Sequence, residues 1–383
     1  MAFTNRYAFL DSTRGLAVFL AVLIHAVRSF GYDFTPGQDL IFLITRTATP
    51  ILLIVFGVMV EIVYLRKLRE GVAVVDMRKR LIQRAITCYL LYLAVGLTAL
   101  ASGKIGLEQA LRMAVSLAPA PLAQILFLYA ILLAGLALLL PAMARWGAGA
   151  MLAVGALGWA MKLALAPLLG AEGYGLVAIL GIGKGFAPAI VLCPILVAFG
   201  MLIGERLTGR RRAIWPLGIA GAAVLAVGLA INDKGLLRFA EEFIQIYRWT
   251  NHPLYYAYGI TAASMALLGF HLAWRQGGGP VARICARLGQ HALFFYVAGN
   301  VALNLVPDRQ APDLEVIVLT AGFMALLTLV SLDRAAQRSV IAWVSGGVFR
   351  QIQRIYDGWV RELAGRISAM MPAGGTFKPS ASA

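Results

Sequence analysis

The first apolar stretch of the chain carries three side chains that could do acid–base chemistry. Asp11, Arg14 and His25 lie within the segment from Leu10 to Arg28, and ten apolar or small residues separate Arg14 from His25. On an α-helix these two positions are about 16 Å apart along the axis and differ by only about 20° around it. A helix that spans a bilayer cannot turn such a polar stripe to lipid. The stripe should therefore face protein or water, which makes it the leading candidate for a functional site.

His25 is the residue of this stripe that is best suited to catalysis. A neutral imidazole in a protein-lined cavity can accept a proton from an attacking hydroxyl group, so we predict a general base; the alternative is a histidine that is hydrogen-bonded within the core. Arg14 and Asp11 form either a structural pair or a group that positions a substrate. No serine or cysteine has the spacing of a nucleophile, and no HExxH motif or carboxylate cluster indicates a metal. No permanently bound cofactor is predicted.

Other polar residues lie within apolar segments or beside them. If the first helix runs outward and the second runs inward, Glu61 reaches the depth of Arg14 and could pair with it, while Arg46 reaches the depth of His25. A guanidinium group at that depth could stabilise an oxyanion. On this basis we predict six substrate-binding residues: Arg46, Glu61, Asn251, His252, Asn300 and Asn304.

Composition indicates an integral membrane protein. Of its 383 residues, 60% are hydrophobic and only 14% are charged, which is too apolar for a soluble globular protein. The formal net charge of +16 does not require a nucleic-acid partner, because Lys and Arg gather in the cytoplasmic loops of membrane proteins. The three cysteines have no paired spacing, so neither a disulfide framework nor a zinc site is indicated.

Apolar windows of about 20 residues predict an all-α, polytopic membrane bundle with ten transmembrane helices. The distribution of Lys and Arg between successive loops favours a cytoplasmic N-terminus and a cytoplasmic C-terminus. Residues 1–332 are predicted to form the transmembrane domain. Ten spans without cysteine-rich ectodomains and with a short N-terminus favour a bacterial inner membrane. The ten predicted spans are 8–30, 39–65, 81–102, 121–142, 148–168, 186–206, 213–231, 252–275, 289–306 and 314–332.

The last part of the chain, 333–383, is predicted to be a basic cytoplasmic tail. Apolar residues recur at helical spacing among its arginines, from Val348 to Leu363, so it could form an amphipathic helix on the inner leaflet. The alternative is a solvated, partly disordered segment. Its final residues, PAGGTFKPSASA, are predicted to be disordered.

The opening segment LDSTRGLAVFLAVLIHA resembles the first helix of the membrane acyltransferase-3 family, within the transmembrane acyltransferase superfamily. In that family an Arg and a His are separated by ten residues, as Arg14 and His25 are here. The segment FAPAIVLCPILVAFGMLIGERL is similar to one in the glucan-succinylating and heparan-type branches. Two positions differ from the family pattern: Asn300 stands where many relatives have His, and Gln124 replaces an acid.

The resemblance implies transfer of an acyl group from cytoplasmic acyl-coenzyme A, with acetyl-coenzyme A expected as the donor. The acceptor would be a hydroxyl or amine of a glycan or of a lipid-linked saccharide on the outer side. Membrane lipid is also expected to be a partner of the protein. In this view His25 acts as the general base and Arg14 orients the donor. A proton-coupled or anion-coupled transporter or flippase is the alternative, and a non-catalytic scaffold is a third possibility.

Overall fold

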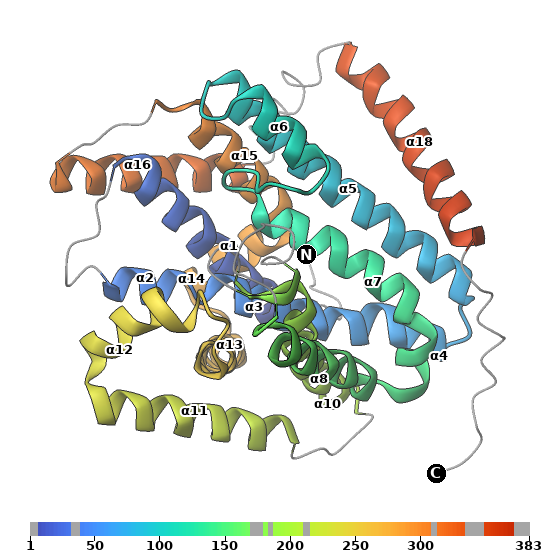
Figure 1. Cartoon of the computed structure of the whole chain (residues 1–383), viewed down its shortest axis with the longest axis horizontal. Coiled ribbons are helices and arrows are strands. Elements are labelled where there is room, and N and C mark those ends of the chain that lie inside the picture. The colour runs from blue at the N-terminus through green and yellow to red at the C-terminus, as the bar shows by residue number, and fades with distance from the viewer. Residues whose placement is uncertain are drawn as a thin grey trace.

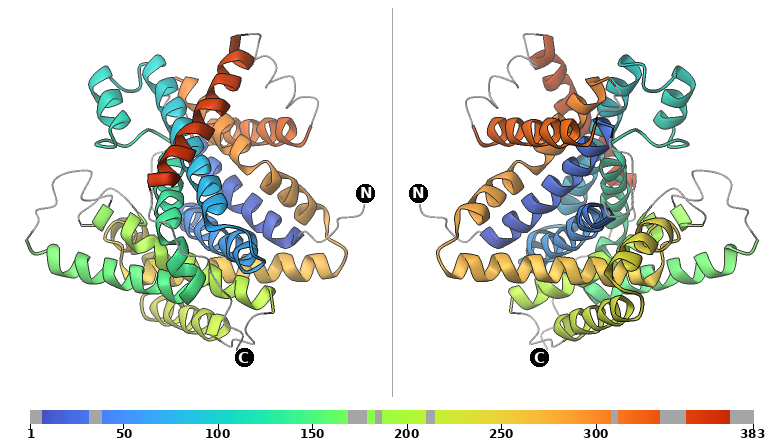
Figure 2. Two further views of the ribbon diagram at one scale, coloured as in Figure 1. Left: turned by 90° about the vertical axis from the view of Figure 1, so that its right-hand side faces the viewer. Right: turned by 90° about the vertical axis from the view of Figure 1, so that its left-hand side faces the viewer.

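The computed structural model describes residues 7–31, 39–168, 179–182, 187–209, 215–307, 312–333 and 348–370. All regular secondary structure in these ranges is helical, which confirms the predicted all-α class. Helix α1 (Ala8–Ser29) runs through the middle of the assembly (Figures 1 and 2). It packs against α3 (Ala48–Met59), α13 (Pro253–Arg275), α14 (Pro280–Gln290) and α15 (Ala292–Leu305). The segment that carries Arg14 and His25 is therefore enclosed by other helices.

Nine helices in the described part of the chain are long and apolar enough to cross a membrane. They give the protein the architecture of an integral membrane protein. These candidate spans are Ala8–Ser29, Leu40–Arg69, Val74–Ala101 (α5), Gln124–Trp146 (α7), Ala148–Leu165 (α8), Ile190–Leu207 (η2, Ile190–Leu192, and α10, Cys193–Leu207), Trp215–Lys234 (α11), Pro253–Arg275 and Asp313–Leu332 (α16). Shorter helices between them are α6 (Leu107–Ala114), α12 (Leu236–Glu242) and the π-helix η3 (Phe243–Tyr247).

The segment predicted as a ninth span, 289–306, differs from the other nine. The chain turns at His291, between α14 and α15, and α15 is only 14 residues long. A helix of that length spans about 21 Å, less than the hydrocarbon core of a typical bilayer. Within the described ranges, nine full-length candidate spans and one short apolar helix thus take the place of the ten predicted spans.

The second candidate span is interrupted at Arg46 and Thr47. Helix α2 (Asp39–Thr45) ends there and α3 begins at Ala48, while η1 (Val60–Leu65) and α4 (Arg66–Arg69) continue the segment after α3. Pro50 has no amide proton for the carbonyl of Arg46, and the Thr47 hydroxyl donates to Ile44 O at 2.6 Å. Both features weaken the helix at the same turn. As a result, Arg46 lies at a helix break.

Glycines bring neighbouring helices into backbone contact at several places. A Cβ added to Gly15 would lie 1.8 Å from Cys285 O, and one added to Gly289 would lie 1.8 Å from Asp11 O, so α1 and α14 touch directly. Between α3 and α10 a Cβ on Gly200 would lie 2.0 Å from Ile54 O. The close packing of small residues expected for helices in lipid is present at these contacts.

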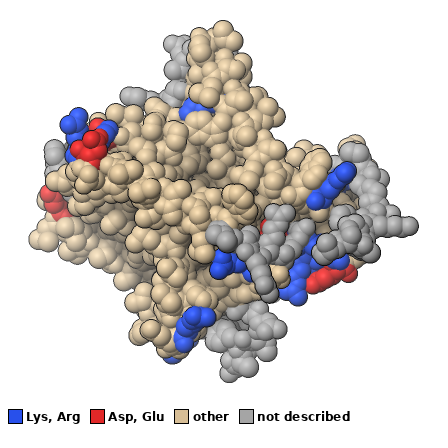
Figure 3. Space-filling view, turned by 90° about the horizontal axis from the view of Figure 1, so that it is seen from below, with Lys and Arg blue, Asp and Glu red and all other residues tan. Residues whose placement is uncertain are grey.

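In the tail, a helix forms over Val348–Met370 (α18) and packs beside α5 (Figure 1). Ala364 and Ser368 are buried, whereas Trp359 is 53% exposed. The predicted disordered end lies outside the described residues. Figure 3 shows a broad face of the molecule with few charged side chains, most of them near its margins, as expected for a surface in contact with lipid.

Candidate active site around His25

His25 lines a cavity of about 160 Å³ that several distant segments build together. Helix α1 supplies His25 and Arg28, the α2–α3 break supplies Arg46, and the turn before α13 supplies Arg248 and Trp249. The other residues that line it are Ala21, Ile24, Thr45, Ala48, Thr49, Leu122, Gln124, Ile125, Leu128, Ala187, Tyr255 and Tyr296.

A hydrogen bond fixes the imidazole of His25. Its Nδ1 lies 2.7 Å from Oδ1 of Asn300, a fully buried residue on α15. Because an amide oxygen can only accept, Nδ1 carries the proton in this arrangement, and in the neutral imidazole Nε2 then keeps its lone pair. The ring of Tyr296, one turn before Asn300, lies edge-on to the imidazole with 6.1 Å between ring centres. A neutral histidine held in one orientation and one tautomer is the form that a general base requires.

Three arginines line the same cavity, and none of the described residues that line it is acidic. Arg28 follows His25 by one helical turn, and its guanidinium lies over the Phe42 ring at 5.9 Å. Arg248 is only 8% exposed, and its guanidinium lies 4.2 Å from the centre of the Trp249 ring. No acceptor among the described residues reaches Arg46 Nε or Arg248 Nη1. The cavity therefore has strongly positive character.

The turn that carries Arg248 and Trp249 is held from several sides. Asn251, at φ 51°, is fully buried, and its Oδ1 accepts from Ala189 N at 2.7 Å and from the Tyr256 hydroxyl at 3.0 Å. The ammonium group of Lys162 on α8 donates to Thr250 O, and to Asn251 O at 3.2 Å. These bonds fix the backbone beside the cavity.

Burial lowers the pKa of Arg248 to about 10, an effect that the Tyr255 hydroxyl opposes and the charge of Arg28 reinforces. A pKa of about 10 still leaves Arg248 protonated at neutral pH. The guanidinium therefore contributes a full positive charge to the cavity under physiological conditions.

Asp11, Arg14 and Glu61 do not line this cavity. Asp11 and Arg14 form an ion pair at 2.8 Å one turn apart on α1, which is one of the two roles predicted for them. Glu61 is fully buried and pairs with Arg69 at 2.6 Å. The predicted Glu61–Arg14 pair is therefore wrong. The π-helix η1 and α4 continue the chain beyond Glu61, and this places Arg69 beside the Glu61 carboxylate.

Three further predicted residues hold helices and turns in place. Asn304 donates to Val95 O at 2.9 Å and to the Thr98 hydroxyl at 3.1 Å, which ties α15 to α5. His252 caps the start of α13 by accepting from Leu254 N at 3.2 Å, and its ring packs against Tyr247. With Asn251, these residues support the site without lining the cavity.

Arg28, Arg248, Tyr255 and Tyr296 line the cavity but are absent from the predicted site. Arg28 could have been recognised, because it follows His25 by three positions and so shares its side of the helix. Arg248 could not, since it lies in a connection whose fold depends on Lys162 and Asn251. Within the described residues no group of three His, Cys, Asp or Glu side chains could hold a metal ion.

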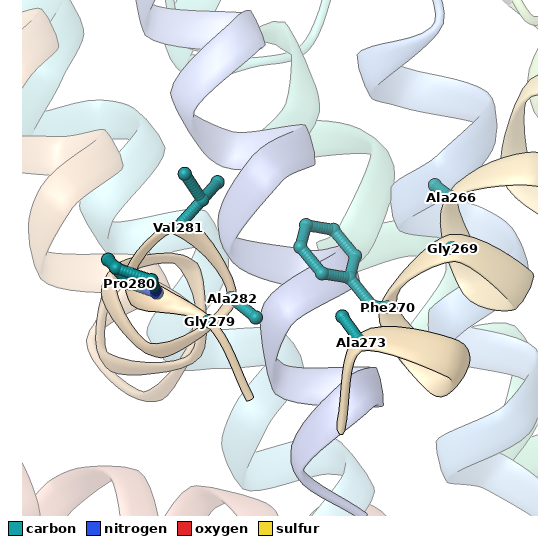
Figure 4. A pocket seen from close by; sticks show the side chains of 8 residues that line it. All are labelled: Ala266, Gly269, Phe270, Ala273, Gly279, Pro280, Val281 and Ala282. Atoms are coloured by element: carbon teal, nitrogen blue, oxygen red, sulfur yellow. The ribbon is translucent and has the colours of Figure 1, made fainter. Parts of the chain in front are cut away.

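Two other hollows differ from the His25 cavity in character. The first, about 440 Å³, lies between η1, α4 and α5 and is lined by the basic residues Lys67, Arg80 and Arg84 together with Tyr64, Gln83 and Thr87. The second, about 430 Å³, lies between α13 and the start of α14, where Phe270, Val281 and small residues line it (Figure 4). Its side chains are all apolar, so it offers no group for acid–base chemistry.

Comparison with known proteins yields no relative: no family model, curated protein or solved structure matches this chain.

Proposed function

We propose that this protein is an integral membrane acyltransferase that moves an acyl group from cytoplasmic acyl-coenzyme A to a saccharide on the outer side of a bacterial inner membrane. The observation that carries the proposal is the 2.7 Å bond between His25 Nδ1 and Asn300 Oδ1 in a polar cavity within a bundle of apolar helices. An ionisable group so placed in a membrane protein is a functional candidate by default. The resemblance of the first helix to the acyltransferase-3 family gives the reaction class.

The proposed chemistry uses Nε2 of His25. This nitrogen takes the proton of the acceptor hydroxyl while the hydroxyl oxygen attacks the carbonyl carbon of the thioester. The carbon–sulfur bond then breaks, an ester forms, and the coenzyme A thiolate leaves and takes up the proton. Arginine side chains at the cavity would stabilise the oxyanion that develops on the carbonyl oxygen during the attack.

The donor would enter from the opposite end of α1. With the N-terminus in the cytoplasm, the cavity lined by Lys67, Arg80 and Arg84 opens near the inner surface, and its charge suits the phosphates of coenzyme A. Arg14, paired with Asp11, lies about 16 Å below His25 along α1. The pantetheine arm of the donor would have to cover this distance.

The test is a transfer assay with protein in liposomes, radiolabelled acetyl-coenzyme A and membrane extract as the source of acceptor. Wild-type protein should label a glycan or lipid product, and His25→Ala should abolish the labelling. The matched control is His252→Asn, which alters a histidine outside the cavity and keeps a helix-capping side chain. Equal transfer by the His25→Ala protein would rule out the proposed base.

An anion transporter or flippase is a second candidate, and the backbone gives it specific support. The second span breaks at Arg46, and the helix pair α14–α15 breaks at His291. Interrupted helices are a feature of transporter binding sites. Liposomes with an imposed ion or proton gradient separate the two functions, because a transporter accumulates a labelled anion without forming a covalent product.

A further inference from the structure

We infer that the cavity beside His25 is an anion-binding subsite, in which Arg46 and Arg248 take a phosphate or carboxylate group carried by the substrate. Assigning this group to a substrate rests on the proposed function, whereas the binding of the anion does not. The inference narrows the substrate class: the molecule that reacts near His25 carries a negative charge close to the reacting hydroxyl or carbonyl group.

The first argument is the charge balance of the cavity. The guanidinium groups of Arg46 and Arg248 line it, and the described residues supply no carboxylate to its wall. Like charges gathered away from bulk water are costly unless a counter-charge joins them. Arg248 is 8% exposed, so solvent offsets little of this cost. An anion bound between Arg46 and Arg248 would offset it.

The second argument is unused hydrogen-bonding capacity. Arg46 Nε and Arg248 Nη1 are both buried and donate to no acceptor among the described residues. Buried donors are nearly always paired in folded proteins. The planar guanidinium group suits the oxygens of phosphate and carboxylate in particular, because it can donate two parallel hydrogen bonds to them.

The third argument is the direction of the helices around the cavity. Helices α3 and α7 both begin at its wall, with Ala48 and Thr49 from one and Gln124 and Ile125 from the other. The N-terminus of a helix carries partial positive charge and free amide protons, which favour anions. Two such termini reinforce the charge of the arginines.

Direct binding tests the inference without relying on catalysis. Protein in nanodiscs of zwitterionic lipid is titrated with inorganic phosphate, and separately with succinate, at constant ionic strength, and its melting temperature is recorded. A ligand that binds only the folded state raises the melting temperature in a saturable way. We expect such a rise for the wild-type protein with at least one of the two anions.

Arg46→Gln and Arg248→Gln should each weaken that binding about tenfold or more, the usual effect of losing a hydrogen bond to a charged group. Arg238→Gln is the matched control, because that arginine lies on α12 with its side chain 72% exposed. If a glutamine variant does not fold, Arg46→Lys or Arg248→Lys replaces it in the experiment. Lysine keeps the positive charge but cannot donate two parallel hydrogen bonds, so anion binding should weaken and remain measurable. The inference is overturned if neither anion stabilises the wild-type protein, or if the substituted proteins are stabilised as strongly as wild type.

Acyl-transfer assays show whether the acceptor or the acyl chain carries the anionic group. If the acceptor carries it, glucose 6-phosphate should be a better acceptor than glucose, and Arg46→Gln should remove the difference. If the acyl chain carries it, succinyl-coenzyme A should be the better donor, with the same dependence on Arg46. Arginine-dependent phosphate or succinate binding in a protein that never transfers an acyl group would refute the proposed function and leave the anion site standing.

Discussion

At the scale of single residues, the pair His25–Asn300 defines the site more closely than the pair Asp11–Arg14. The imidazole of His25 lies at the cavity wall, and one hydrogen bond to Asn300 sets its orientation and its tautomer. Asn304, one turn further along α15, is equally buried but bonds to the backbone and side chain of α5 instead. Two identical side chains on one helix thus have different tasks, which gives a controlled comparison.

Replacing Asn300 by alanine should lower kcat for acyl transfer by about 10- to 100-fold with little change in KM, the cost found when metal-ligating histidines lose such an orienting hydrogen bond. Asn304→Ala should instead lower the melting temperature and leave kcat close to wild type, because it loosens the contact between α15 and α5. The radiolabel assay and thermal unfolding measure the two effects. An Asn300→Ala protein with wild-type kcat would show that this bond does not serve catalysis.

His252 gives a prediction about pH. Partial burial, reinforced by the charges of Lys162 and Lys234, lowers its pKa below the ordinary value of 6.5. The unfolded chain therefore takes up a proton at a higher pH than the folded protein does, so the free energy of unfolding should fall as the pH drops below about 6.5. His252→Asn keeps the cap on α13 and should make the melting temperature less sensitive to pH between 7.5 and 5. If the His252→Asn protein kept the wild-type pH dependence of its melting temperature, His252 would not be the source of that dependence.

At the scale of elements, the site depends on close contacts between helices. Helix α1 is held against α14 through Gly15 and Gly289, and α3 is held against α10 through Gly200. These contacts fix the two segments that deliver His25 and Arg46. Arg46 lies at the break between α2 and α3 and lines the cavity there.

Gly200→Ala should lower stability by about 1–3 kcal/mol, because the new Cβ meets the carbonyl of Ile54 and the backbones must separate. Gly218→Ala in α11 is the matched control, since a Cβ there has nothing within 4 Å and alanine favours the helix by up to about 1 kcal/mol. Thermal unfolding in detergent compares the two proteins. Equal melting temperatures for both variants would show that the α3–α10 contact is less close than described.

At the scale of the whole molecule, the described part of the chain holds nine long apolar helices and the short helix α15, and the polar cavity is lined from α1, α2, α3, α7, α13 and α15 and the turns beside them. The basic residues of the loops predict that the N-terminus and the C-terminus lie in the cytoplasm. Under the proposed function, this topology would decide which end of α1 receives the donor. Exposed positions in the described loops allow the topology to be tested directly.

In a protein without its native cysteines, Glu108→Cys on α6 should react with a membrane-impermeant thiol reagent in intact cells. Glu70→Cys and Gln276→Cys should react only after the membrane is permeabilised. Glu70 and Glu108 have side chains that are 53% and 81% exposed, so burial should not prevent labelling. Labelling of Glu70→Cys from outside would reverse the proposed orientation.

Local sequence alone determined the helical class, the apolar segments and the polar stripe of the first helix. Hydropathy and helical periodicity depend on residues near one another in the chain, so the spacing of Arg14 and His25 is sufficient to place them on one face of a helix. The same information indicated the helix in the tail, which is present over Val348–Met370.

Only the tertiary structure decided which polar residues share a cavity. Arg248 lies far from Arg28 and Arg46 in the chain, and it joins them because Lys162 and Asn251 hold its turn beside α1. Hydropathy gives the depth of a side chain in a membrane but not the rotation of its helix or the neighbour it meets. Asn300 and Asn304 could be separated into two roles only by the packing of α15 between α1 and α5. The physical reason is that contacts between helices depend on packing across the bundle, which no local stretch of sequence specifies.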